Sequence, residues 1–276
     1  YDDITMDPEI QQASDALLAS DPDLQEEHTI RPSSSSSSGC PFASQHSREP
    51  SLPYQFIPLK SGSHKVSEGT KRLMEEEVSF DDLKTMTHAF YQLAFQDDTL
   101  DKFIRSHSDP HGDRFAKWIH QKLSGSDLWD QDRQTRNLSP VTVANDRIVI
   151  VRDRTSAHSA AWWSPKRPAD QVGRRFQLDE CRVWMRLHFW AMRQAGLVEK
   201  SPSFADYYVK FIGHFVSVYE KRATKFARES FRWSADPKNT EAYIQGGRIM
   251  KDVLGVKHTE AKNTLPEEEV DYEWPH

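Results

Sequence analysis

Two histidines stand one helical turn before aromatic residues in this sequence. His158 precedes Trp162 and Trp163, and His111 precedes Phe115. An imidazole can ligate iron, and aromatic rings can line a flat apolar slot for a macrocycle. The chain has 12 histidines, so an ordinary helical core with capped or exposed histidines would supply the same inventory. The residue types alone therefore leave both a haem pocket and a plain core open.

Five segments with helical periodicity would position these side chains. The first opens with Ser79 as a candidate N-cap and Asp82 three residues later, which is close to a capping box. Its predicted apolar face is Leu83, Met86, Phe90 and Leu93. The fifth opens in the same way at Ser203, with Asp206 three residues on. The predicted helices cover residues 79–93, 110–123, 155–163, 178–195 and 203–219. The sequence therefore predicts an all-α domain.

One stretch inside this region breaks the helical pattern. Residues 141–151 form two β-branched runs around Asn145 and Asp146, and this pattern predicts a small hairpin or extended loop. Residues 164–175 contain two prolines and four basic residues and are expected to form a surface loop. That basic loop is either solvated or a clamp for carboxylates of a cofactor or an acidic partner.

The ends of the chain differ in composition from the middle. Residues 1–75 hold a six-serine run (33–38), several prolines and few periodic apolar positions, and such a segment buries too little to offset its chain entropy. The acidic stretch 265–276 ends a second flank. We expect a disordered or partner-bound arm over 1–75, a globular domain over 76–232 and a C-terminal extension over 233–276. Both flanks should be sensitive to proteases in the isolated protein.

Composition argues against several classes of function. The net charge is −6, which gives no electrostatic reason to expect nucleic acid. No apolar stretch is long enough to span a bilayer. Cys40 and Cys181 cannot form a disulfide framework, so we expect an intracellular protein, cytoplasmic or organellar. No phosphate-binding glycine loop or nucleophile elbow stands out.

Two further patterns are only weak indications of a metal or haem site. His107 and His111, with Asp109 between them, resemble part of a zinc site, but no cysteine lies nearby. Cys40 and Pro41 form a dipeptide found in haem-regulatory motifs, which more often is simply a turn.

The order of the segments resembles the truncated (bacterial-like) haemoglobin family, in particular its second group. Residues 90–104, FYQLAFQDDTLDKFI, resemble the B helix and the following turn, and residues 111–125, HGDRFAKWIHQKLSG, resemble the E helix. Residues 178–197 resemble the G helix, with Trp184 at the position of the tryptophan that roofs the pocket. The short AHSAAWW segment supplies His158 at the proximal place. The likeness covers about residues 79–230 and implies a globin-like helical sandwich.

The resemblance also implies roles for six residues. His158 would ligate the iron of haem b. Tyr91 would donate a hydrogen bond to bound dioxygen, with His111 and the Trp184 indole N–H as further donors. Phe103 and Phe115 would pack on the haem face; Phe103 stands eight residues before His111, the separation expected from the family.

The sequence departs from the family pattern in three ways. Ala157 stands where a basic residue usually precedes the proximal histidine. The predicted hairpin lengthens the connection before His158, and the basic loop lengthens the connection between His158 and Trp184. These departures bear on whether haem is retained more than on the fold.

Three hypotheses for function follow. The first is a haem protein that binds dioxygen or another diatomic gas and, if it is an enzyme, acts as a nitric oxide dioxygenase-like oxidoreductase. The second is a globin-fold subunit or adaptor, with or without haem, whose arms run along neighbouring proteins in a larger assembly. The third is a gas sensor that signals through the arms.

Overall fold

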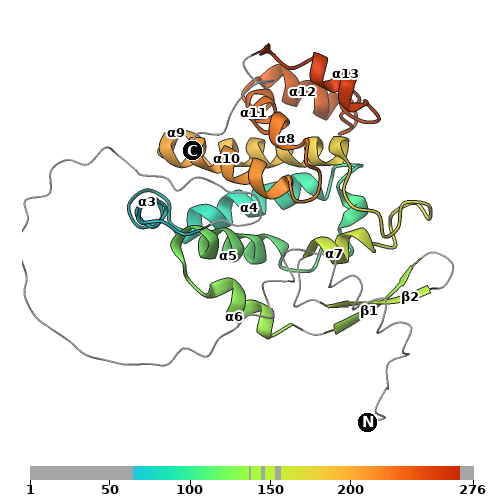
Figure 1. Ribbon diagram of the computed structural model, residues 1–276, viewed down its shortest axis with the longest axis horizontal. Coiled ribbons are helices and arrows are strands. Elements are labelled where there is room, and N and C mark those ends of the chain that lie inside the picture. The colour runs from blue at the N-terminus through green and yellow to red at the C-terminus, as the bar shows by residue number, and fades with distance from the viewer. Residues whose placement is uncertain (1–64, 137, 144–146, 153–156, 268–276) are drawn as a thin grey trace, which may run out of the picture. The chain divides into compact units, whose positions relative to one another are not determined.

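The computed structural model describes residues 65–136, 138–143, 147–152 and 157–267 (Figure 1). All of them lie in the compact unit that spans residues 55–276. The elements are α3 (Glu68–Arg72), a π-helical turn (Leu73–Glu77), α4 (Phe80–Ala94), a 3-10 turn (Asp101–Phe103), α5 (His111–Ser124), α6 (Leu128–Gln134), β1 (Leu138–Val143), β2 (Arg147–Arg152), α7 (Ala157–Trp162), α8 (Leu178–Gln194), α9 (Leu197–Lys200), α10 (Pro202–Val216), α11 (Thr224–Trp233), α12 (Pro237–Gln245) and α13 (His258–Asn263).

Helix α4 begins at the predicted capping box. The Ser79 hydroxyl accepts a hydrogen bond from the backbone N–H of Asp82, and the Asp82 carboxylate accepts one from the backbone N–H of Ser79. Two N–H groups that the first helical turn cannot satisfy are thereby paired. The face of α4 that is buried includes the four predicted positions, Leu83, Met86, Phe90 and Leu93. Both predictions for this helix are confirmed.

Helix α4 packs against both α5 and α8, and α11 packs against α8 and α10. Gly112 lies where α5 approaches α4. The Thr87 hydroxyl donates to the carbonyl of Gly112 at 2.8 Å, and a Cβ on Gly112 would lie 2.4 Å from His88 Cδ2. A side chain at this position would therefore require the exposed His88 ring to move.

The N-terminus of α10 differs from the expectation. The cap is Ser201, whose hydroxyl accepts from the backbone N–H of Phe204, and Pro202 occupies the first turn. Proline has no N–H and a fixed φ, which suits the start of a helix. The predicted capping pair of Ser203 and Asp206 is therefore wrong by two residues.

The predicted hairpin is present between α6 and α7. Strands β1 and β2 pair antiparallel, with Leu138 opposite Arg152 and Val143 opposite Arg147. Helix α7 follows and carries His158. The all-α expectation is confirmed for the described residues, in which this hairpin is the only pair of strands.

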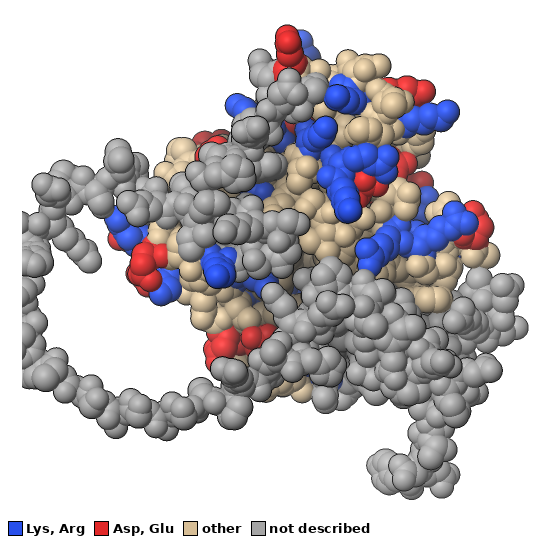
Figure 2. Space-filling model, in the orientation of Figure 1, with Lys and Arg blue, Asp and Glu red and all other residues tan. Residues whose placement is uncertain are grey.

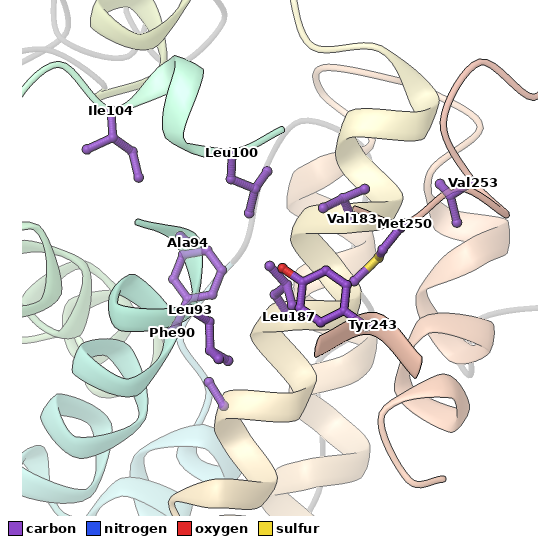
Figure 3. Packing of buried hydrophobic residues seen from close by; sticks show 11 residues of the cluster. Phe90, Leu93, Ala94, Leu100, Ile104, Val183, Leu187, Tyr243, Met250 and Val253 are labelled. Carbon is purple, nitrogen blue, oxygen red and sulfur yellow. The ribbon is translucent and has the colours of Figure 1, made fainter. Parts of the chain in front are cut away.

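Residues beyond α11 pack into the same core as α4 and α8. Figure 3 shows Tyr243 beside Leu187 of α8 and Met250 beside Val183 of the same helix, in one cluster with Phe90 and Leu93 of α4. The full cluster of buried residues is Phe90, Leu93, Ala94, Leu100, Ile104, Val183, Leu187, Ala191, Tyr243, Met250 and Val253. The boundary expected at residue 232 therefore does not mark the end of the packed core.

The predicted N-terminal arm (1–75) overlaps the described structure only at its end. Residues 68–77 are helical, and Leu73 and Met74 are buried. The rest of the arm, residues 1–64, and the acidic residues after Glu267 lie outside the described residues. No helix in the described part of the chain is long and apolar enough to cross a membrane.

Charged side chains of both signs share the face shown in Figure 2, where Lys and Arg lie among Asp and Glu. Although the net charge of the chain is −6, this face is therefore not uniformly acidic.

Candidate functional site

Three of the six predicted site residues surround one buried ring, Phe90 of α4, and a fourth stacks on one of these three. Tyr91 and Trp184 contact Phe90 with ring centroids 5.1 and 5.3 Å away, and Phe115 lies 6.4 Å away. His111 stacks on Tyr91 at 5.1 Å with the planes 22° apart. Tyr91, His111, Phe115 and Trp184 are each only partly buried. We call this group, together with His188, the α4–α8 cluster.

Tyr91 is suited to donate a hydrogen bond. Burial raises the pKa of its phenol to about 12, while the nearby charge of Arg114 opposes that shift. The hydroxyl therefore keeps its proton at physiological pH and can serve as a donor.

His111 is less suited to the donor role that the resemblance implies. Its Nε2 lies 2.8 Å from the backbone carbonyl oxygen of Ser106, which can only accept. Burial lowers the pKa of His111, so the ring is neutral and its single N–H is the one that donates to Ser106. The other nitrogen, Nδ1, is then an acceptor, so His111 lines the cluster without a proton to offer a ligand.

The remaining two predicted residues belong to a second group of rings around Phe176. Phe103 lies 5.0 Å and His158 5.5 Å from the Phe176 centroid, both edge-on. Tyr219 packs on His158 at 4.5 Å, and the Tyr219 hydroxyl is hydrogen-bonded to His158 Nδ1. We call Phe103, His158, Trp162, Phe176 and Tyr219 the α7 cluster.

The basic loop after α7 holds the α7 cluster to the 3-10 turn. Lys166 Nζ lies 3.0 Å from an Asp101 carboxylate oxygen. The Arg167 guanidinium stacks over Phe103 at 4.8 Å and donates to the backbone carbonyls of Trp162 and Arg174. Arg167 is buried, so at this position the expectation of a solvated loop is wrong. Its guanidinium is enclosed with the Arg174 carbonyl and with the Trp162 carbonyl, which also accepts from the Gly173 N–H.

Three residues of these clusters were not predicted from the sequence. Phe176 and Tyr219 connect Phe103 to His158 through ring contacts. Both are far from these residues in the sequence, so no local pattern predicts the contacts. His188 is different, because it follows Trp184 by four residues on the same face of α8 and could have been found from that spacing. Its ring stacks on Trp184 at 4.7 Å with the planes 7° apart.

The alternative zinc site at residues 107–111 is not assembled. His107 Nε2 contacts an Asp101 carboxylate oxygen at 2.5 Å, and its ring stacks on Phe95, whereas His111 is bonded to Ser106. Among the described residues, no group of three His, Cys, Asp or Glu side chains is arranged to hold a metal ion by itself.

The donor chemistry of the α7 cluster fits a macrocycle that brings its own metal. A histidine that ligates a metal through one ring nitrogen usually has the other fixed by a hydrogen bond, as Tyr219 fixes Nδ1 of His158. Trp162 is 3% exposed, and its indole N–H has no hydrogen-bond partner among the described residues. A carboxylate on a bound molecule would satisfy that donor.

No protein-family model, curated protein or solved structure matches this chain. The assignment of function therefore depends on the residues described above.

Proposed function

We propose that this chain is a globin-like protein that binds haem b through His158 and takes up dioxygen or another diatomic gas. One observation carries the proposal. The six residues singled out in the sequence gather in two aromatic clusters, and in one of them a histidine is oriented through Nδ1 by Tyr219.

Each cluster has a role in this proposal. His158 would hold the iron, and Phe103 and Phe115 would pack on the macrocycle. When bound, haem supplies an iron atom for gas binding and for redox chemistry such as oxidation of nitric oxide. The chain's own contribution is to orient His158, to exclude water with aromatic rings and to present the Tyr91 hydroxyl as a donor.

The packing of the helices supports the globin-like part of the proposal. Helix α4, which carries Tyr91, contacts both α5, which carries Phe115, and α8, which carries Trp184. The resemblance to truncated haemoglobins implies that these same three segments surround the cofactor.

The test is titration of the purified full chain with haemin. A Soret band with one equivalent of haem is expected for the wild type. His158→Ala should lose the wild-type spectrum, because the proposed iron ligand is removed. His214→Ala, which removes a buried histidine of α10, is the matched control and should leave the band intact. An unchanged spectrum in His158→Ala would remove that residue as the ligand, and no band in the wild type would favour the haem-free subunit instead.

A further inference from the structure

His188 is buried at the centre of the α4–α8 cluster. It is 0% exposed, and aromatic rings surround it. Its centroid lies 5.1 Å from Phe90, 5.3 Å from Phe115 and 4.7 Å from Trp184. Two of these three rings, Phe115 and Trp184, are predicted to line the ligand site.

The single polar partner of His188 in the described structure determines where its proton lies. Nε2 is 2.9 Å from the Tyr208 hydroxyl. Burial raises the pKa of Tyr208 well above its usual value, so the hydroxyl keeps its proton, and burial lowers the pKa of His188 to about 3, so the ring is neutral. If Tyr208 donates to Nε2, the imidazole proton must be on Nδ1. The opposite arrangement would leave both the Tyr208 proton and Nδ1 without partners, and is therefore disfavoured.

Nδ1 of His188 has no hydrogen-bond partner, although it is fully buried. An unpaired buried N–H costs free energy, and nearly all buried polar groups in native proteins are paired with protein atoms or with an ordered water molecule. The surrounding rings disfavour a charged occupant. The occupant must therefore be small, uncharged and able to accept a hydrogen bond.

We infer that His188 binds a small uncharged molecule through Nδ1–H, and that His188 rather than His111 is the donor histidine of the site. Two molecules share this chemistry, namely an internal water and a polarised diatomic ligand. The second case rests on the proposed haem function, whereas the first does not.

The position of the proton can be tested without haem. In the full chain labelled with ¹⁵N-histidine, the His188 signals are assigned by their loss in His188→Phe. We expect the Nδ1-protonated form, with a nuclear Overhauser contact from Nδ1–H to water if water is the occupant. Tyr208→Phe removes only a hydroxyl and should shift His188 toward the Nε2-protonated form. An Nε2-protonated wild type would overturn the inference.

The second measurement is the rate of dioxygen dissociation from the reduced, haemin-reconstituted chain. His188→Phe should release dioxygen roughly three- to tenfold faster if the gas is the occupant. His214→Phe, a buried histidine outside both clusters, should not change the rate. If His188→Phe leaves the dissociation rate unchanged and the wild type shows the contact between Nδ1–H and water, the occupant is water. If the rate is unchanged and no water contact is seen, the inference is overturned. If the wild type takes up no haem, the proposed function fails while the proton measurement still decides the role of His188.

Discussion

At the scale of single residues, the proton on each polar ring decides what the clusters can bind. Tyr91 and His188 keep a proton for a ligand, whereas His111 gives its proton to Ser106. His111 was predicted as a site residue and His188 was not. A histidine at the start of a helix is easily noticed, whereas one in the middle of a long helix cannot be distinguished from an ordinary core residue. Only the partners of each nitrogen distinguish the two, and those partners are set by tertiary packing.

Tyr91 provides the first prediction, which concerns gas release. Tyr91→Phe should speed dioxygen dissociation about ten- to hundredfold, since a hydrogen bond to a polarised ligand contributes roughly 1.5–3 kcal/mol. Because the phenol pKa is about 12, its ionisation should leave the wild-type rate unaffected below about pH 11. Stopped-flow release from the reconstituted chain measures both effects. Tyr207→Phe, a buried tyrosine of α10, is the control. Identical rates in Tyr91→Phe and the wild type would exclude Tyr91 as a donor.

At the scale of elements, α8 is joined to α11 by an ion cluster that local patterns do not reveal. Glu229 of α11 contacts Arg186 at 2.5 Å and Arg182 at 3.4 Å, and Arg186 also contacts Asp252 at 2.7 Å. Both arginine side chains are 4% exposed and Glu229 is 14% exposed, so these charges depend on one another for solvation.

Removing the charge of Glu229 should therefore be costly. Glu229→Gln is expected to lower the free energy of unfolding by about 3–5 kcal/mol, because it leaves the buried Arg182 guanidinium without a carboxylate and leaves Arg186 with only the exposed carboxylate of Asp252. Glu76→Gln, which breaks an exposed pair with Arg72, should cost less than about 1 kcal/mol. Urea denaturation of both variants provides the comparison. Equal losses of unfolding free energy in the two variants would show that the Glu229 ion cluster contributes no more than an exposed ion pair.

The elements that the sequence predicted well are those with local signals. The capping box of α4, the apolar face of α4 and the antiparallel pairing of β1 with β2 are each determined by residues close together in the chain. Helices α12 and α13 were missed because they are short and polar, with only Tyr243 and Ala261 buried in them. The place of Tyr243 in the core depends on contacts with α4 and α8, which no periodicity in the sequence reveals.

At the scale of the whole molecule, a buried hydrogen bond connects helix α12 to the turn after α4. The Tyr243 hydroxyl donates to Asp97 at 2.6 Å, and the other Asp97 carboxylate oxygen accepts from the backbone N–H groups of Thr99 and Leu100. Burial raises the pKa of Asp97, and these hydrogen bonds oppose the rise.

This raised pKa predicts the direction of a pH effect on stability. The folded state holds the Asp97 proton to a higher pH than the unfolded state does, so the contribution of Asp97 is fully present below about pH 3.9 and is lost as pH rises through the folded-state pKa. Asp97→Asn should remove this dependence, whereas Asp81→Asn, at an exposed position, should not. Unfolding in urea across the acidic range measures the difference. A constant gap between Asp97→Asn and the wild type would contradict the prediction.

The last prediction concerns whether residues 237–267 belong to the domain that carries the candidate site. Met250 is 2% exposed and packs in the cluster that contains Phe90, the ring around which Tyr91 and Trp184 gather. Met250→Ala should lower the free energy of unfolding by about 2–5 kcal/mol, because it removes buried methylene and sulfur contacts and leaves a cavity. Ile244→Ala alters a side chain of the same segment that is 45% exposed, and should cost far less.

Urea denaturation followed by tryptophan fluorescence distinguishes the two outcomes. A single transition that moves to lower urea in Met250→Ala would show that the C-terminal helices and the α4–α8 cluster unfold together. If Met250→Ala proves as mild as Ile244→Ala, the segment is a separable extension, as the sequence suggested. In the coupled case, haem affinity should fall in Met250→Ala as well, since a cavity in the cluster that contains Phe90 weakens the packing of the ring that Tyr91 and Trp184 contact.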